Sequence, residues 1–134
     1  MINQLSVFVE NKFGRMAAVT NVLESNGVNI RALSLADASD FGVLRMIADD
    51  TDKAKECLRE SGVMVKTTKV ITAGMDNRPG GLAKILNILT EGQISIEYMY
   101  AFLDSRGDKA WTVLETDDNA RAENLLRSIG VELK

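Results

Sequence analysis

Patterns of apolar and polar residues predict the same order of elements twice along the chain. Residues 5–9 alternate between apolar positions and others, which predicts a half-buried strand. Apolar residues at helical spacing follow over residues 16–23, and strand patterns follow over residues 28–35 and 42–48, joined by a turn at residues 38–40. A second helical pattern, with Ala54, Cys57 and Leu58 on its inner face, precedes a fourth strand that begins at residues 63–65. The first half is therefore predicted to fold as strand–helix–strand–strand–helix–strand.

The second half of the chain repeats the first. With a shift of 77 − 11 = 66, six residue pairs are identical between residues 11–30 and 77–96. With a shift of 117 − 49 = 68, seven pairs are identical between residues 49–63 and 117–131. The two additional residues fall between these blocks, and we place them near residues 104–109, where turn-forming residues cluster. The pattern indicates a tandem duplication.

Each repeat predicts an α+β unit of the ferredoxin-like βαββαβ type. Such a unit has a four-stranded antiparallel sheet with two helices on one face, and leaves the other face uncovered. We assign residues 1–68 to the first unit and residues 69–134 to the second, whose last strand, over residues 131–133, is short. The linker over residues 66–69 contains no Pro or Gly, so we expect two rigidly docked units.

A turn that recurs between the first strand and the first helix of each repeat carries the candidate chemistry. A helix N-terminus presents unpaired N–H groups and the positive end of the helix dipole, which suit a carboxylate. An Asn side chain both donates and accepts hydrogen bonds, and Gly permits close approach of the backbone to a ligand. The same Asn-x-x-Gly spacing is also ordinary turn chemistry, and spacing alone favours neither interpretation. The two segments are Asn11-Lys12-Phe13-Gly14-Arg15-Met16 and Asn77-Arg78-Pro79-Gly80-Gly81-Leu82.

With the second strands that start at Gly27-Val28-Asn29-Ile30 and Ile94-Ser95-Ile96, these segments resemble the ACT domain family, once per repeat. The resemblance covers essentially the whole chain and implies an allosteric regulatory module that senses an amino acid. It also implies units paired side by side, with the effector between the turn of one unit and the second strand of its neighbour. The candidate ligand-binding residues are then Asn11, Phe13, Gly14, Arg15, Met16, Asn29, Ile30, Asn77, Pro79, Gly80, Gly81, Leu82, Ser95 and Ile96.

The two candidate sites are unequal. Ser95 stands where the first repeat has Asn29, and Phe13 stands where the second has Pro79. These departures from the family pattern leave open whether one turn or both bind a ligand. Arg15 could pair with an acidic group of the ligand, and a solvated surface arginine fits its position about equally well.

Composition and charge exclude several other classes of function. The net charge is −3 and no basic stripe is present, which argues against nucleic-acid binding. No apolar run approaches the ~20 residues that span a membrane, and a lone cysteine, Cys57, suits a reducing, cytoplasmic setting. The chain has no histidine, no Cys beside a base and no clustered acid pair, so we expect neither an enzyme nor a cofactor or metal. Asp49-Asp50 and Asp117-Asp118 are interpreted as helix N-caps rather than metal ligands.

Two regulatory functions remain. The first is a non-catalytic protein that binds a free amino acid and biases a separate enzyme of amino-acid metabolism, or its own assembly. The alternative is a regulatory subunit of an amino-acid biosynthetic enzyme that acts mainly by protein–protein contact. A homodimer is expected in either case, because unpaired sheet edges and a bare sheet face invite pairing. The aromatic residues Tyr98, Tyr100 and Phe102 either pack within the unit or bury the helix-free face against a second chain.

Overall fold

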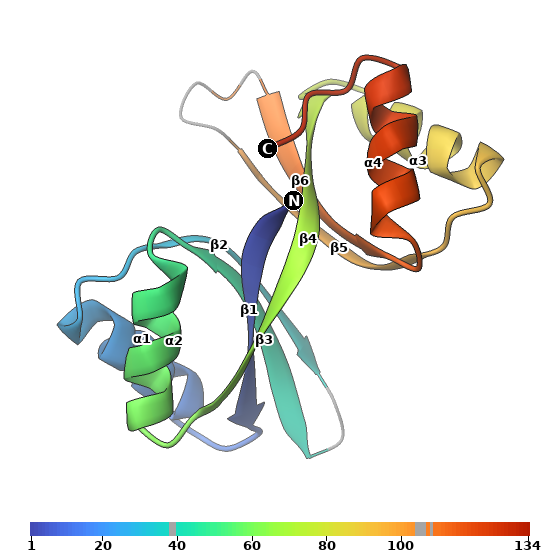
Figure 1. Cartoon of the computed structure of the whole chain (residues 1–134). Coiled ribbons are helices and arrows are strands. Elements are labelled where there is room, and N and C mark those ends of the chain that lie inside the picture. Colours follow the sequence, from blue (N-terminus) through green and yellow to red (C-terminus); the bar gives the residue numbers. More distant parts are fainter. Residues whose placement is uncertain (38–39, 104–106, 108) are drawn as a thin grey trace. The chain divides into compact units, whose positions relative to one another are not determined.

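The computed structural model describes residues 1–37, 40–103, 107 and 109–134 (Figure 1). The predicted turn at residues 38–40, apart from Asp40, and residues 104–106 and 108 of the predicted insertion lie outside the described residues. Tertiary contacts divide the chain into two compact units. The first-repeat unit is Asn3–Lys69, and the second-repeat unit is Val70–Lys134 together with Met1–Ile2. The elements are β1 (Ile2–Glu10), α1 (Arg15–Ser25), β2 (Ile30–Asp37), β3 (Phe41–Ala48), α2 (Thr51–Glu60), β4 (Met64–Asp76), α3 (Gly81–Glu91), β5 (Ile96–Leu103), β6 (Lys109–Thr116) and α4 (Asn119–Ser128).

In the first-repeat unit, β3 lies between β1 and β2 and runs antiparallel to both. Leu44 of β3 therefore faces Val7 of β1 on one side and Leu35 of β2 on the other. Helices α1 and α2 lie together on one face of this sheet (Figure 1). The core between them and the sheet buries Leu5, Val7, Val9, Val19, Leu23, Val28, Leu44, Met46, Ala48, Ala54, Cys57 and Leu58.

The second-repeat unit has the same design. Strand β6 lies between β4 and β5 and is antiparallel to both, so that Leu114 faces Ile71 and Met99. Helices α3 and α4 cover one face (Figure 1). The core buries Ile71, Ala73, Ile85, Leu89, Ile94, Leu114, Ala122 and Leu126. The predicted α+β class and the two βαββαβ repeats are confirmed.

Strand β4 belongs to both units. Residues 66–69, predicted as a linker, lie inside this strand, and the boundary between the units falls at Lys69 and Val70. The strand order is β2-β3-β1-β4-β6-β5, so the two separate four-stranded sheets that the pattern predicted are replaced by one sheet of six strands. The predicted last strand over residues 131–133 is wrong in extent. An isolated bridge joins Leu133 to Ala73 in place of that strand.

The helix-free side of the sheet is buried in both units, although the repeat pattern predicted a bare face. Gln4 and Ser6 of β1 point to that side and are at most 8% exposed, and Thr72 of β4 and Val113 of β6 are fully buried. Trp111, paired across the sheet with Gly74, is buried as well. The buried hydroxyl of Thr72 has no hydrogen-bond partner, so it carries an uncompensated desolvation cost.

Candidate ligand-binding site

Backbone hydrogen bonds hold the turn between β1 and α1. The amide of Arg15 donates to the carbonyl of Lys12 at 3.3 Å, and the amide of Ala18 donates to the carbonyl of Gly14 at 3.0 Å. Gly14 has φ 82°, in the left-handed region that side chains disfavour. A β-carbon at Gly14 would meet nothing within 4 Å, so the backbone conformation alone accounts for this glycine.

Helix α1 begins without a side-chain cap. Gly14 occupies the capping position, and the first turn of the helix contains no acidic residue. Helices α2 and α4 differ, because the carboxylates of Asp50 and Asp118 each accept a hydrogen bond from a backbone amide of the first turn at 3.1 Å. The predicted N-caps are therefore confirmed at these two residues. The uncapped start of α1 leaves N–H groups available to an anion.

Asp37, the last residue of β2, faces this turn. The side-chain amide of Asn11 donates to its carboxylate, with 3.4 Å between Nδ2 and Oδ1. The register of the sheet explains the proximity, because Asp37 pairs with Gly42 and Gly42 pairs with Val9 near the end of β1. Strands β1 and β2 therefore end at the same level.

A cavity of about 490 Å³ opens between the turn and the end of β2. The start of α1 and Asp37 at the end of β2 both line it. An anion-binding group and a cation-binding group thus share one cavity. Its lining residues are Val9, Glu10, Asn11, Lys12, Gly14, Met16, Ala17, Leu35, Ala36, Asp37 and Gly42.

Only part of the candidate set from the first repeat meets here. Asn11, Gly14 and Met16 line the cavity. Phe13 is fully exposed. Arg15 lies outside this cavity, with its guanidinium 3.9 Å from the carboxylate of Glu10.

Asn29 and Ile30 lie at the opposite end of β2 from Asp37. Seven residue steps along a strand correspond to about 23 Å, so neither residue reaches the turn of its own unit. The backbone amide of Asn29 donates to the carboxylate of Asp49 at 3.0 Å. In the second repeat the amide of Ser95, which precedes Ile96, makes the same bond to Asp117. These two aspartates therefore tie the start of the second strand to the end of the third.

The turn of the second repeat is built differently. Gly80 repeats the left-handed conformation of Gly14, with φ 88°. The side-chain amide of Asn77 donates to the backbone carbonyl of Gly107 at 2.9 Å rather than to a carboxylate. A β-carbon at Gly81 would lie 2.1 Å from the carbonyl oxygen of Asp76, so this turn folds tightly on its own backbone. Of the other two candidates, Pro79 is exposed and Leu82 is half-buried.

The family model described as an ACT domain pair matches residues 1–131. The chain belongs to this family. The resemblance of both repeats to ACT domains, expected from the turn segments and the second strands, is thereby confirmed. The chain matches no curated protein.

Solved structures show the same ACT pair fold. The protein BT0572 from Bacteroides thetaiotaomicron is 38% identical, with a TM-score of 0.91 over 98% of this chain and 90% of that one. The regulatory subunit of aspartate kinase from Thermus thermophilus, in a ligand-free form, is 16% identical, with a TM-score of 0.70 over 95% and 89% of the two chains. The corresponding subunit from Thermus flavus is 17% identical, with a TM-score of 0.68 over the same shares.

Eight of the eleven residues that line the ACT pair's cavity, including three from β2, were missed by the sequence analysis. Leu35, Ala36 and Asp37 come from the end of the second strand, whereas the resemblance had pointed to its start. The signal was available in the predicted topology. When one antiparallel strand lies between two others, those two run parallel and end on the same side of the sheet. Polar residues at the end of the second strand are therefore expected to lie near the turn that follows the first strand.

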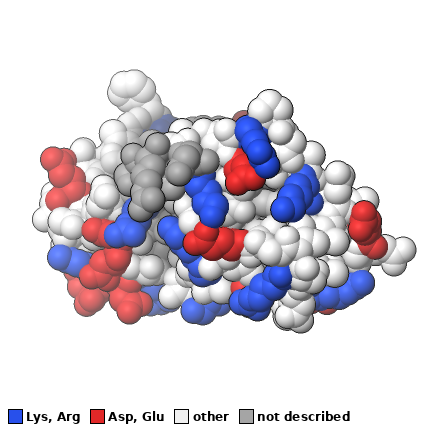
Figure 2. Space-filling model, turned by 90° about the horizontal axis from the view of Figure 1, so that it is seen from above, with Lys and Arg blue, Asp and Glu red and all other residues white. Residues whose placement is uncertain are grey.

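Charges around the turn of this ACT pair are mixed. The ammonium group of Lys12 lies 3.1 Å from the carboxylate of Glu10. This hydrogen bond, with the charges of Lys12 and Arg15, holds the pKa of Glu10 below its usual value. Figure 2 shows basic and acidic side chains interspersed over the face that it draws. In the part of the chain that the structure describes, no group of three acidic or Cys side chains is placed to hold a metal ion. Nor is any described helix long and apolar enough to cross a membrane.

Proposed function

We propose that this ACT pair is a non-catalytic regulatory protein that binds a free amino acid between the β1–α1 turn and the end of β2. The observation that carries the proposal is the shared cavity of the uncapped α1 N-terminus and the Asp37 carboxylate. The α-carboxylate of the ligand would accept hydrogen bonds from amides of the first turn of α1 other than that of Arg15, which donates to Lys12. Its α-ammonium group would pair with Asp37, beside the side chain of Asn11.

The size and walls of the cavity suit a small ligand. A volume of about 490 Å³ lies within the ~300–1,000 Å³ typical of small-molecule sites. Val9, Met16 and Leu35 supply an apolar wall for a ligand side chain. In the second repeat the side-chain amide of Asn77 already donates to the backbone carbonyl of Gly107, so we assign ligand binding to the first repeat.

The comparisons support a regulatory role. Two of the structural relatives are regulatory subunits of aspartate kinase, an enzyme of amino-acid metabolism. By analogy, this ACT pair regulates a separate enzyme chain of amino-acid metabolism, and the effector preferentially stabilises one state of the assembly. The chain contains no histidine, which fits a binding protein better than an acid–base enzyme.

A thermal-shift screen against the twenty amino acids, followed by calorimetry of each hit, tests the proposal. A ligand at ~100 times its dissociation constant stabilises the folded state by ~2.7 kcal/mol, which is readily measured. We expect one amino acid, or a few of related chemistry, to raise the melting temperature. A flat response to all twenty would remove amino-acid binding as the function.

Variants of the cavity locate the site. Asp37→Asn removes the partner of the α-ammonium group and is expected to weaken binding by at least about tenfold. Asn11→Ala should weaken it less, because its hydrogen bond to Asp37 is long. Asn77→Ala is the matched control and should leave affinity unchanged. Full affinity in Asp37→Asn, or a loss in Asn77→Ala alone, would show that the ligand binds elsewhere.

The alternative, a subunit that acts by protein–protein contact, also has a supporting observation. Leu33 and Leu35 are each 52% exposed on β2, which stands at one end of the strand order. Phe13 of the β1–α1 turn is fully exposed as well. An exposed apolar edge strand invites pairing, and we propose a homodimer through it. Light scattering of the Leu33→Lys variant tests this, since the dimer should dissociate while the circular dichroism spectrum stays the same.

A further inference from the structure

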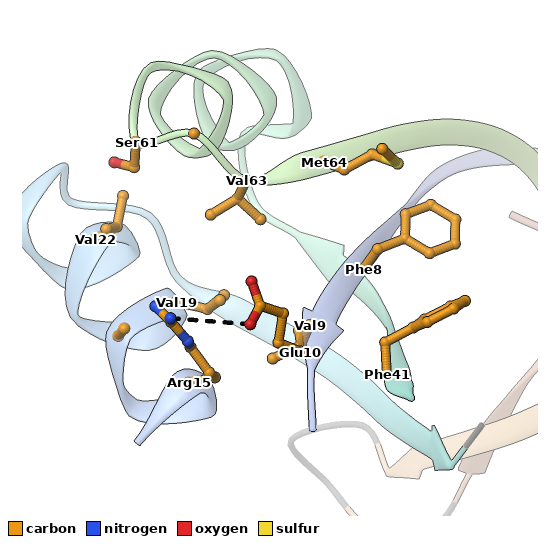
Figure 3. A pocket seen from close by; sticks show the side chains of 12 residues that line it. Phe8, Val9, Glu10, Arg15, Val19, Val22, Phe41, Ser61, Val63 and Met64 are labelled. Atoms are coloured by element: carbon orange, nitrogen blue, oxygen red, sulfur yellow. Dashed lines mark ion pairs between the residues drawn. The ribbon is translucent and has the colours of Figure 1, made fainter. Parts of the chain in front are cut away.

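The first-repeat unit has a second cavity, which involves a different face of α1 (Figure 3). Its volume is about 500 Å³. Val19 and Val22 of α1 and Val63 before β4 form one end (Figure 3). Phe8, Phe41 and Met64 form the other, where the two aromatic rings meet edge to face with 6.0 Å between centroids. Val9 and Glu10 line both cavities, but neither Asn11 nor Asp37 lines this one, so the groups proposed to hold the amino acid lie outside it.

A single charged pair stands among these apolar side chains. A dashed line joins the guanidinium of Arg15 to the carboxylate of Glu10 (Figure 3), with 3.9 Å between the two groups. That distance is too long for a hydrogen bond, and Lys12 already pairs with Glu10 at 3.1 Å. Two cations therefore share one anion, and the group as a whole is positive. The guanidinium keeps its planar set of donors for a second carboxylate.

The corresponding cavity of the second-repeat unit is smaller. Phe41 pairs with Glu10 in the first repeat, and Lys109 pairs with Asp76 in the second. With the repeat shifts of 66 and 68, Lys109 thus stands for Phe41 and Glu132 for Met64. Lys109 and Glu132 form an ion pair, and the corresponding cavity has only about 210 Å³.

Trp111 also helps to fill the second repeat at this place. Its ring lies against Gly74, which replaces Phe8, and a β-carbon on Gly74 would come within 3.2 Å of it. The ammonium group of Lys134 lies 4.2 Å from the ring centroid. In the first repeat, by contrast, Phe41 is 42% exposed and Met64 is 70% exposed. The first repeat therefore retains an open apolar cavity of about 500 Å³, whereas the corresponding cavity of the second repeat is less than half that size.

We propose that this cavity is a second ligand site, specific for a monocarboxylate with an apolar aromatic or branched aliphatic body. The carboxylate would bind the guanidinium of Arg15 through paired hydrogen bonds. The body would displace water from Val19, Val22 and Val63 and cover the exposed edges of Phe41 and Met64. The site goes beyond the proposed amino-acid function because it needs no α-ammonium partner.

NMR titration of the full chain with 3-phenylpropanoate tests this site, and 3-phenylpropanamide serves as the neutral analogue of the same shape. We expect the acid to shift the methyl signals of Val19, Val22 and Val63 with saturable binding. The amide should bind at least about tenfold more weakly, because it lacks the charge that pairs with Arg15. Equal affinity for acid and amide, or no shift of these signals by the acid at about 20 mM, would overturn the proposal.

Four variants separate this site from the amino-acid site. Arg15→Gln should weaken binding of 3-phenylpropanoate by about tenfold, whereas Arg31→Gln, an equal loss of charge at an exposed position of β2, should not. The double variant F41K/M64E introduces the closing pair of the second repeat and should abolish binding with an unchanged circular dichroism spectrum. Asn11→Ala should leave binding of 3-phenylpropanoate unchanged whether or not an amino acid binds at the turn. Retained affinity in Arg15→Gln, or in F41K/M64E with its fold intact, contradicts the assignment, as does weaker binding in Asn11→Ala.

Discussion

Replacement of Thr72 by valine is expected to stabilise the protein. The side chain of Thr72 is fully buried in β4, and its hydroxyl has no hydrogen-bond partner. In the unfolded chain that hydroxyl is hydrated, so folding removes its water without compensation. Valine has the same shape and exchanges the hydroxyl for a methyl group. Ser6, the equivalent residue of the first repeat, accepts a hydrogen bond from Gln4 at 3.5 Å and does not share this cost.

The expected gain follows from the cost of an unsatisfied group. A buried hydroxyl without a partner costs about 1–3 kcal/mol, so Thr72→Val should raise the free energy of unfolding by about 2 kcal/mol. With a urea m-value of about 2 kcal/mol/M, the unfolding midpoint would rise by about 1 M. Urea titration followed by circular dichroism measures this shift, and an unchanged m-value shows that the unfolding transition is the same.

A second threonine provides the control. Thr112 is also fully buried, but its hydroxyl donates to the sulfur of Met75 at 3.2 Å. Thr112→Val should therefore gain less than Thr72→Val, under about 1 kcal/mol. A midpoint for Thr72→Val at or below that of the wild type, with the same m-value, would refute the reasoning. It would mean that the hydroxyl of Thr72 is satisfied in solution.

Two further predictions concern the helices. Asp50→Ala and Asp118→Ala each remove a side-chain cap and should lower the free energy of unfolding by about 1 kcal/mol, while Asp50→Asn keeps an acceptor and should cost less. Urea titration compares them. Burial raises the pKa of the Cys57 thiol above its ordinary value of 9.0. The unfolded state therefore loses its thiol proton first, and stability should fall as the pH rises from about 9. Cys57→Ala should remove that part of the decline, and equal pH profiles for the two proteins would contradict this.

Periodicity predicted the order of the elements well but placed some boundaries wrongly. Ala54, Cys57 and Leu58 are buried as expected, because helical spacing directly identifies an inner face. The second strand begins at Ile30 rather than at residue 28. Val28 is buried like a strand residue, yet its amide donates to the carbonyl of Leu23 and ends α1. Apolar character shows that a residue is buried, but not which backbone group its amide bonds.

The turn could be predicted from the sequence because its residues are close along the chain, whereas the place of Asp37 beside it could not. Asn11 and Gly14 are close in sequence, and a left-handed glycine before a helix is a local feature. Asp37 reaches Asn11 only because β3 lies between β1 and β2, which is a property of the whole sheet. Arg15 follows Gly14 directly in the sequence, yet its side chain lies near Glu10 and outside the cavity that Gly14 lines. The geometry of the turn, and not closeness along the chain, decides this.

The shared strand limits how the length of this chain can change during evolution. Side chains alternate between the two faces of a strand, so one residue gained or lost within β4 would turn one half of the strand over relative to the other. Core residues of one repeat would then exchange places with residues of the helix-free side. Selection should therefore hold the length of β4 constant between relatives, whereas the two extra residues of the second repeat are accommodated between β5 and β6. The length of β4 is thus constrained by both repeats at once, and changes in chain length are expected in the loops.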